Sequence, residues 1–184
     1  MLSDQLKNMG EDVIKYSKSL TIDTIERINP EWIISFNYKY IIKQDAIDRM
    51  KGRIVNLHTS LLPWNRGANP NFWSFFDKTP KGVTIHLISK ELDRGDILFQ
   101  KECIFDASEE TFASTYQKLM EEIVSLFVNK WNVIKSGHYI PKKQRGEGSY
   151  HSAKELLLLR EKIEFSWDDN VEETIEACRK ILVK

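Results

Sequence analysis

The sequence predicts an α/β domain built around a mostly parallel sheet. Compact apolar runs such as WIISF (32–36) and RIVNLH (53–58) alternate with helix-like stretches through the first hundred residues, a pattern typical of βαβ units. The chain has 184 residues, of which 41% are hydrophobic and five are Trp. This is enough to form the core of one domain with a small appendage.

The strand candidates are short apolar runs bounded by turn residues. They lie at 11–17, 32–36, 53–58, 82–88 and 96–105. Helices are expected between these runs and after the last of them. They lie at 2–9, 22–28, 43–50, 71–76, 108–135, 152–161 and 170–182. Thr21 is expected to cap the helix at 22–28, and Pro30 to close it.

The helix at 108–135 is the longest predicted element. We expect Asp106 or Ser108 to cap it and Gly137 to end it. Its apolar positions recur at helical spacing and predict a face that packs against the sheet. These positions are Phe112, Leu119, Ile123, Leu126 and Trp131. A polar loop that contains glycines follows at 141–151.

Composition and charge exclude several classes of function. Twenty-seven basic residues balance twenty-seven acidic ones, so the overall charge gives no support for nucleic-acid binding. The two cysteines, Cys103 and Cys178, lie far apart in the sequence, which is typical of a protein from a reducing cytoplasm. No apolar run approaches the ~20 residues that span a bilayer, so we expect no membrane partner. The start of the chain lacks the pattern of a signal peptide.

Several well-known site motifs are missing from the sequence. There is no HExxH and no paired CxxC, so we expect no metal site. There is no GxGxxG and no GxxxxGK[ST] to cradle a phosphate. Ser60 lies near a histidine but outside any GxSxG motif, which argues against a serine hydrolase.

The stretch NLHTSLLPWNRGANP (56–70) carries the first candidate site. Asn56 and His58 stand two residues apart at the end of a predicted strand, so both side chains point to the same face. A carboxamide beside an imidazole can bind a developing oxyanion and handle a proton. In open α/β sheets, ligands bind beyond the carboxyl ends of the strands, which is where these residues would lie.

The stretch ELDRGDI (91–97) carries the second candidate. Asp93 and Asp96 are equally plausible partners for His58 on composition alone. Whichever carboxylate meets the imidazole would orient it and raise its basicity. His86 is a further candidate, with a buried structural role as the alternative.

These residues carry a resemblance to a known family. NLHTSLLPWNRGANP, followed by GVTIHLISKELDRGDILFQ (82–100), resembles the folate-dependent formyltransferases, which include glycinamide ribonucleotide, methionyl-tRNA and sugar N-formyltransferases. The resemblance covers residues 30–105. It places the family's catalytic Asn and His at Asn56 and His58. The family's Asp directly follows a Leu, which selects Asp93 over Asp96.

The resemblance implies transfer of a formyl group from 10-formyltetrahydrofolate to an amine, without a metal. Asn56 and His58 would donate hydrogen bonds to the developing oxyanion, and Asp93 would orient His58 or a water and help to remove the amine proton. In the family, the pterin lies against the backbone of two loops. The corresponding residues here are Tyr38, Tyr40, Ile41 and Ile42 in one loop, and Lys90 and Asp93 in the other.

The acceptor side resembles that of small bacterial sugar N-formyltransferases, which act on nucleotide-linked 4-amino sugars. The similarity lies in PWNRGANPNFWS (63–74) and GEGSYH (146–151). The candidate substrate-binding residues are Trp64, Asn65, Arg66, Gln144, Tyr150 and His151, with plain packing as the alternative for Trp64 and Tyr150. The basic residues of the same loop would neutralise a diphosphate or form a solvated charge run. They are Lys142, Lys143 and Arg145.

The family normally opens with an apolar strand and a helix, whereas this sequence begins at what resembles the end of that helix. We therefore expect a Rossmann-like formyltransferase fold that lacks the first strand and has additional C-terminal helices. Its catalytic domain would span 1–136, short at its N-terminus, and a C-terminal loop and helical extension would span 137–184. An uncovered sheet edge would favour a homodimer.

Other interpretations stay open. The chain could be a non-catalytic or truncated relative that binds folate or a nucleotide sugar, or a formyltransferase for another small amine such as glycinamide ribonucleotide. IEFSWDDNVEETIEACRK (163–180) resembles the segment that leads to the RNA-holding domain of methionyl-tRNA enzymes. The sequence stops at Lys184, so we expect no tRNA substrate.

Overall fold

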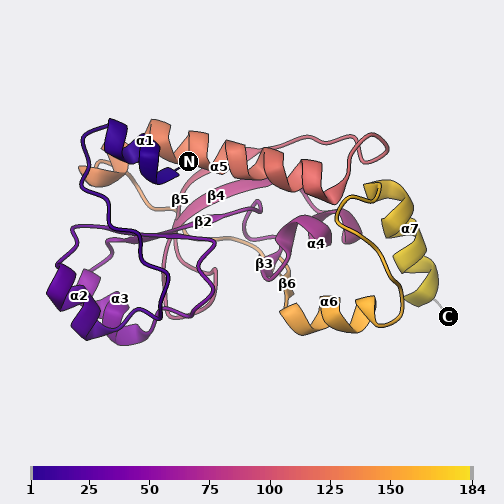
Figure 1. Ribbon diagram of the computed structural model, residues 1–184, viewed down its shortest axis with the longest axis horizontal. Coiled ribbons are helices and arrows are strands. Elements are labelled where there is room, and N and C mark those ends of the chain that lie inside the picture. The colour runs from indigo at the N-terminus through magenta and orange to yellow at the C-terminus, as the bar shows by residue number, and fades with distance from the viewer. Residues whose placement is uncertain (1, 183–184) are drawn as a thin grey trace.

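The computed structural model describes residues 2–182, in which four strands form one sheet in the order β1–β2–β4–β5. Figure 1 shows the long helix α5 lying along this sheet, with α2 and α3 gathered near one end of the molecule and α6 and α7 near the other. The strands of the sheet are β1 (Ile33–Phe36), β2 (Ile54–His58), β4 (Gly82–Leu87) and β5 (Ile97–Glu102). A separate short ladder joins β3 (Arg66–Gly67) to β6 (Tyr150–His151).

The prediction of a mostly parallel sheet is wrong. Only β1 and β2 pair in parallel, whereas β2–β4 and β4–β5 are antiparallel. The connection from β2 to β4 carries the short helix α4 (Pro70–Phe76) and returns β4 in the opposite direction. The loop between β4 and β5 is too short for the crossover that a parallel pair requires. The domain is α/β with a mixed sheet.

The strand expected at 11–17 is also absent, since these residues run as irregular chain. Side chains hold this segment in place of a ladder. Glu11 accepts a hydrogen bond from Trp131 Nε1 at 2.8 Å and pairs with Lys135, and Val13 packs on the core beneath α5. The start of this segment is therefore held by contacts with α5 and not by strand pairing.

Three helices precede β2 in residues 2–182. They are α1 (Leu2–Asn8), α2 (Ile22–Ile28) and α3 (Gln44–Met50). Thr21 caps α2 as predicted, accepting a hydrogen bond from the Thr24 amide at 3.3 Å. The helices α2 and α3 cover the face of the sheet opposite α5, where Ile25, Ala46, Met50 and Ile54 are buried together.

The long helix α5 (Phe112–Lys135) starts later than predicted. Its cap is Thr111 and not Asp106 or Ser108: Thr111 accepts from the Ser114 amide, and Ser114 accepts from the Thr111 amide, each at 3.0 Å. This reciprocal pair is a capping box, which satisfies two helix N–H groups at once. Asp106 and Ser108 bond to each other in the loop before it.

The principal core lies between α5 and the sheet. Because strand side chains alternate, Val55 and Leu57 face α5 while Asn56 and His58 face the other way. Leu119, Ile123, Phe127 and Trp131 line the buried stripe of α5, so the predicted face is confirmed in outline, with Phe127 added and Leu126 only half-buried. The core thus leaves the two polar side chains of β2 on the face that carries the site.

A second core gathers at the far end of the molecule, around α4. The helices α6 (Ala153–Arg160) and α7 (Val171–Leu182) pack there against aromatic residues of α4 and the first turn of α5. Phe72, Phe112 and Phe165 lie at its centre, with ring centroids 5.4 to 6.1 Å apart. Of the helices in residues 2–182, none is both long enough and apolar enough to cross a bilayer.

Candidate active site

A cleft of about 550 Å³ opens beyond the carboxyl ends of β1 and β2. Four stretches of chain supply most of its lining, at 37–42, 56–59, 88–93 and 150–153. Asn56, His58 and Asp93 all face this cleft, so the structure brings the three predicted catalytic residues together. This position matches the general rule for ligand sites in open α/β sheets.

The pairing of β2 with β4 builds the floor of the site. The register sets Asn56 opposite His86 and His58 opposite Thr84. Side chains of directly opposed residues in an antiparallel pair lie on the same face. His86 is therefore brought to the site by the same register that aligns the strands, and it is almost completely buried, at 1% exposure.

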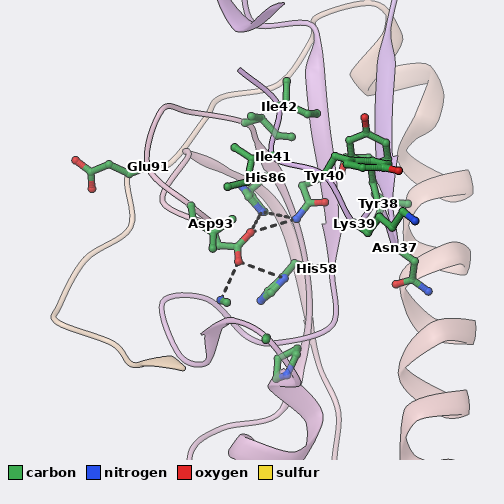
Figure 2. A pocket seen from close by; sticks show the side chains of 18 of the residues that line it. Asn37, Tyr38, Lys39, Tyr40, Ile41, Ile42, His58, His86, Glu91 and Asp93 are labelled. Carbon is green, nitrogen blue, oxygen red and sulfur yellow. Dashed lines mark hydrogen bonds and ion pairs between the residues drawn. The ribbon is translucent and has the colours of Figure 1, made fainter. Parts of the chain in front are cut away.

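Asp93 lies at the centre of the polar cluster, as Figure 2 shows, with dashed lines running to His58, His86 and their neighbours. Its Oδ1 accepts a hydrogen bond from Asn56 Nδ2 at 3.4 Å, and its Oδ2 accepts one from the Gly67 amide at 2.9 Å. Asp93 has a left-handed backbone, with φ +52°. Asp tolerates this conformation better than most residues, and it turns the carboxylate back over the sheet.

His86 is held as a neutral imidazole with a fixed tautomer. Its Nδ1 lies 2.9 Å from the carbonyl oxygen of Leu87, which can only accept, so Nδ1 carries the proton. The free lone pair of Nε2 accepts from Asn56 Nδ2 at 3.1 Å. Burial lowers the pKa of His86 from 6.5 to about 4, and His58 adds to the lowering, against the opposing effects of Asp93 and the Leu87 carbonyl. His86 thus fixes which way the Asn56 amide points.

His58 is oriented by the backbone of the following loop. Its Nε2 donates to the Asn65 carbonyl at 3.2 Å, which leaves Nδ1 as the lone-pair nitrogen of a neutral ring. Nδ1 lies 3.9 Å from Asp93 Oδ2, beyond hydrogen-bond distance. The partner that orients His58 is therefore Asn65 and not Asp93. Asp93 instead places a carboxylate where a proton added to Nδ1 would be stabilised.

One wall of the cleft is the loop at 37–42, which contains the predicted folate-side residues Tyr38, Tyr40, Ile41 and Ile42. The Tyr38 hydroxyl accepts from the Leu20 amide and donates to the Lys18 carbonyl, both at 2.7 Å, so it anchors the loop. The facing wall contains Lys90, which also lines the cleft. Both walls offer backbone donors and acceptors together with apolar side chains, a lining that suits a flat heteroaromatic ring.

The predicted acceptor residues divide into two groups. Tyr150 and His151 line the cleft, whereas Trp64, Asn65, Arg66 and Gln144 lie outside its lining. Asn65 is fully buried, and its Oδ1 accepts from Thr79 Oγ1 at 2.6 Å. Of the six predicted residues, the structure therefore places only the two of β6 at the cleft, next to the start of α6.

His151 lies between two carboxylates. Its Nε2 is 2.8 Å from Asp77 Oδ2, and its Nδ1 is 3.2 Å from Glu155 Oε1. Its ring stacks on Trp73, with centroids 3.9 Å apart and planes 8° from parallel. These contacts fix the ring at the edge of the cleft and leave Tyr150, which is 54% exposed, as the freer aromatic group there.

The sequence did not reveal the backbone groups that hold the site. The Gly67 amide and the Asn65 carbonyl position Asp93 and His58, and no side-chain pattern marks them, because every residue carries such groups. The sequence did contain a sign of His86. Thr84 and His86 stand two residues apart on β4, as Asn56 and His58 do on the neighbouring strand β2. Within residues 2–182, no set of three or more His, Cys, Asp and Glu side chains is arranged to hold a metal ion.

Known proteins share this sequence pattern. Residues 12–130 match the sequence model of the family described as formyl transferase. The chain is 34% identical over 128 residues to the dTDP-4-amino-4,6-dideoxyglucose formyltransferase of Mycobacterium tuberculosis (strain H37Rv), a match that covers 70% of this chain and 53% of that protein. It is 32% identical over 130 residues to the methionyl-tRNA formyltransferase of Fusobacterium nucleatum, with 70% and 42% covered. The chain thus spans about half the length of the curated relatives it matches.

Solved structures share the fold. The formyltransferase PseJ from Anoxybacillus kamchatkensis, crystallised in complex with UDP-4,6-dideoxy-4-formamido-L-AltNAc and tetrahydrofolate, matches with a TM-score of 0.87 at 38% identity, covering 93% of this chain and 90% of that chain. A sugar N-formyltransferase from Shewanella sp. FDAARGOS_354 matches with a TM-score of 0.72 at 26% identity, covering 89% and 66%.

Proposed function

Because this chain belongs to the formyl transferase family, we propose that it moves a formyl group from 10-formyltetrahydrofolate to the amine of a nucleotide-linked amino sugar. One observation carries the proposal. Asn56, His58 and Asp93 meet in the wall of a single cleft, where a fixed amide, an imidazole with a free nitrogen and a buried carboxylate face the same space. Such a set can both stabilise an oxyanion and move a proton.

The chemistry divides among the three side chains. When bound, 10-formyltetrahydrofolate would supply an electrophilic formyl carbon whose oxygen gains negative charge as the amine adds. In its protonated form, His58 would carry a proton at Nδ1 that it can donate toward that charge. Asn56 Nδ2 is a second donor, because its 3.4 Å bond to Asp93 is long and can be exchanged while its bond to His86 is kept. Asp93 would take the proton that the amine loses as its nitrogen bonds to the formyl carbon. The folate nitrogen would take up a proton as its own bond to that carbon breaks, which releases tetrahydrofolate.

Two different parts of the cleft suit the two substrates. We assign the loop at 37–42 and Lys90 to the folate, and Tyr150 with His151 to the nucleotide sugar. The likeness to PseJ, which was crystallised with a UDP-linked 4-formamido sugar and tetrahydrofolate, supports a cleft that receives both substrates. It also favours a UDP-linked 4-amino-4,6-dideoxy sugar as the first acceptor to test, with the dTDP-linked sugar of the mycobacterial relative as the second.

The test is an acceptor panel assayed by mass spectrometry. The chain is incubated with 10-formyltetrahydrofolate and UDP-, dTDP- or GDP-linked 4-amino sugars, with glycinamide ribonucleotide and methionyl-tRNA as the other acceptors. We expect a nucleotide sugar heavier by one formyl group, and about a 10²-fold or greater loss of rate in Asp93→Asn, which keeps the hydrogen-bond acceptor but not the base. Formylation of glycinamide ribonucleotide alone, or folate binding by calorimetry without any product, would contradict the proposal.

The division of labour along the chain is part of the same proposal. Residues 1–136 would form the catalytic body, and residues 137–184 the extension that shapes the acceptor side. Both cysteines are free, which supports a reducing, cytoplasmic setting. A homodimer stays a prediction, which size-exclusion chromatography with light scattering would test.

A further inference from the structure

We infer that Gln144 is a positioning residue for the proposed formyl transfer, acting together with Arg66 to set the place of the Asp93 carboxylate. The inference rests on the proposed function for its kinetic consequence and on geometry alone for the rest. Gln144 was predicted to be a substrate ligand, yet it lies outside the lining of the cleft. Its partners are all protein groups, and they surround the turn that presents Asp93.

The amide nitrogen of Gln144 holds this turn from behind. Its Nε2 donates to the Asp93 carbonyl at 2.7 Å and to the Gly95 carbonyl at 2.9 Å. The two carbonyls flank Arg94, so one side chain spans the turn. Gly95 leaves no room for the turn to shift toward the sheet, because a Cβ there would lie 1.6 Å from the Leu87 carbonyl oxygen. The turn is therefore held between Gln144 and β4.

Arg66 fixes which way the Gln144 amide points. The guanidinium donates to Gln144 Oε1 from Nε at 3.0 Å and from Nη2 at 2.9 Å, and its Nη1 donates to the Glu147 carbonyl at 3.0 Å. A flipped amide would set its NH₂ against the guanidinium and its oxygen against two carbonyls. Arg66 is 3% exposed, so the buried cation needs this acceptor.

The same segment also holds the other end of Asp93. The ladder of β3 and β6 includes a bond from the Arg66 amide to the Ser149 carbonyl at 3.0 Å. The next residue, Gly67, donates its amide to Asp93 Oδ2 at 2.9 Å. Residues 144–149 thus hold Asp93 at two points. Gln144 bonds its carbonyl directly, and Ser149 holds the strand of Arg66 and Gly67, whose Gly67 amide bonds its carboxylate.

The test compares two matched substitutions, Gln144→Glu and Gln100→Glu. Gln144→Glu keeps an acceptor for Arg66 but replaces the donor to the Asp93 and Gly95 carbonyls with a carboxylate that repels them. Gln100 is the control, because its Nε2 also donates to a backbone carbonyl, that of Leu62 at 2.8 Å, and not to the turn at 93–95. A milder second variant, Arg66→Lys, keeps the charge but loses the two-nitrogen contact with Gln144.

Two measurements are made on each variant. Steady-state kinetics should show kcat lower by about 10²-fold in Gln144→Glu, since a small misplacement of a catalytic group has this effect, with the KM values for both substrates unchanged. The Gly67 amide resonance, followed by two-dimensional NMR without any substrate, should move away from its wild-type position and exchange faster with solvent. Arg66→Lys should show the same changes in smaller size, and Gln100→Glu should show neither.

The outcomes separate this inference from the proposed function. If wild type lacks turnover on every acceptor but the Gly67 resonance moves in Gln144→Glu, the positioning holds and the proposed function fails. A raised acceptor KM with normal kcat would make Gln144 a substrate ligand and overturn the inference. An unmoved Gly67 resonance in folded Gln144→Glu would overturn it too. If Gln144→Glu does not fold, the Gly67 resonance of Arg66→Lys decides in the same way.

Discussion

At the scale of single residues, the site depends on two histidines in opposite roles. His86 is neutral, buried and bonded at both nitrogens, so it orients Asn56 and takes no part in proton movement. His58 keeps one nitrogen without a hydrogen bond to protein, 3.9 Å from Asp93. The difference follows from position, since His86 is buried in β4 between β2 and β5, and His58 ends β2 at the cleft.

The lowered pKa of His86 predicts a loss of stability in acid. Folding depresses its pKa from 6.5 to about 4, so between these values the unfolded chain binds more protons, and the free energy of unfolding falls as the pH is lowered. The loss through this window is about 3 kcal/mol. The groups that face His86 are Asn56, His58 and Asp93.

Urea unfolding at pH 7 and at pH 4 measures this effect. His86→Gln carries no titrating ring. Its free energy of unfolding should therefore fall by about 3 kcal/mol less than that of wild type between pH 7 and pH 4. Between pH 7 and pH 8, above the window, the two proteins should change equally. Equal losses in acid would show that His86 does not titrate as proposed.

The three residues that the sequence predicts to be catalytic meet in one cleft, but the groups that hold them could not be predicted from the sequence. The Leu before Asp93 selected it over Asp96, and the structure places Asp93 in the cleft. Arg66 and Gln144 were expected to contact substrate because their stretches of sequence resemble those of small bacterial sugar N-formyltransferases. Their pairing with each other depends on a contact between residues 78 positions apart, which no local pattern encodes.

At the scale of elements, short apolar runs predicted most strands and helices but not how the strands pair. The direction of β4 depends on its partner, and the chain between β2 and β4 contains only the seven residues of α4 as regular helix. The two-residue strands β3 and β6 were missed because neither carries an alternating pattern. Their pairing rests on backbone bonds and on the absence of a side chain at Gly67.

The corrected start of α5 can be tested by removing the cap. Thr111→Ala removes the acceptor for the Ser114 amide and should lower the free energy of unfolding by about 1 kcal/mol. Ser108→Ala removes the side chain once expected to cap this helix and should change it by less than about 0.5 kcal/mol. Thermal and urea unfolding compare the two. A larger effect from Ser108→Ala would contradict the assignment of the cap.

The β3–β6 ladder predicts a strong difference between two glycines with similar backbones. Gly67 has φ +88° and Gly146 has φ +82°. A Cβ at Gly67 would lie 2.2 Å from the His151 carbonyl oxygen, whereas at Gly146 it would meet nothing within 4 Å.

Gly146→Ala should therefore lower the free energy of unfolding, measured with urea, only by the roughly 1–2 kcal/mol that a side chain costs in the left-handed conformation. Gly67→Ala should lower the free energy of unfolding by roughly 2 kcal/mol more, because the new Cβ would force β3 and β6 apart. Its formyl transfer should fall with it, since Gly67 also bonds Asp93. Equal losses at the two sites would argue against the close approach of the strands.

At the scale of the whole molecule, two cores share one helix. Phe112 begins α5 and belongs to the aromatic core of α4, α6 and α7. Leu119 and Ile123 of the same helix belong to the principal core between α5 and the sheet. The α/β formyltransferase fold is confirmed by the likeness to PseJ. The shared helix predicts that the two cores unfold together.

Phe165→Ala tests this coupling. Phe165 is 5% exposed and stacks on Phe72 with ring planes 12° apart, so its loss should lower the free energy of unfolding by about 3–5 kcal/mol. Near-ultraviolet and far-ultraviolet circular dichroism should still give one coincident transition. Leu157→Ala on the outer side of α6, where Leu157 is 64% exposed, is the control and should change little. Two separate transitions would show that the cores are independent.

The segment that carries Gln144 has a consequence for how relatives of this protein diverge. It ends in Tyr150 and His151, which line the cleft, and at its beginning Gln144 bonds the turn that carries Asp93. Under the proposed function, a substitution in this segment that changes sugar binding would also shift the Asp93 turn and so change turnover. Under the proposed function, sugar binding and reaction rate are therefore coupled through one segment, and an exchange that alters the bound sugar would need to move residues 144–151 together with Arg66 and Gly67.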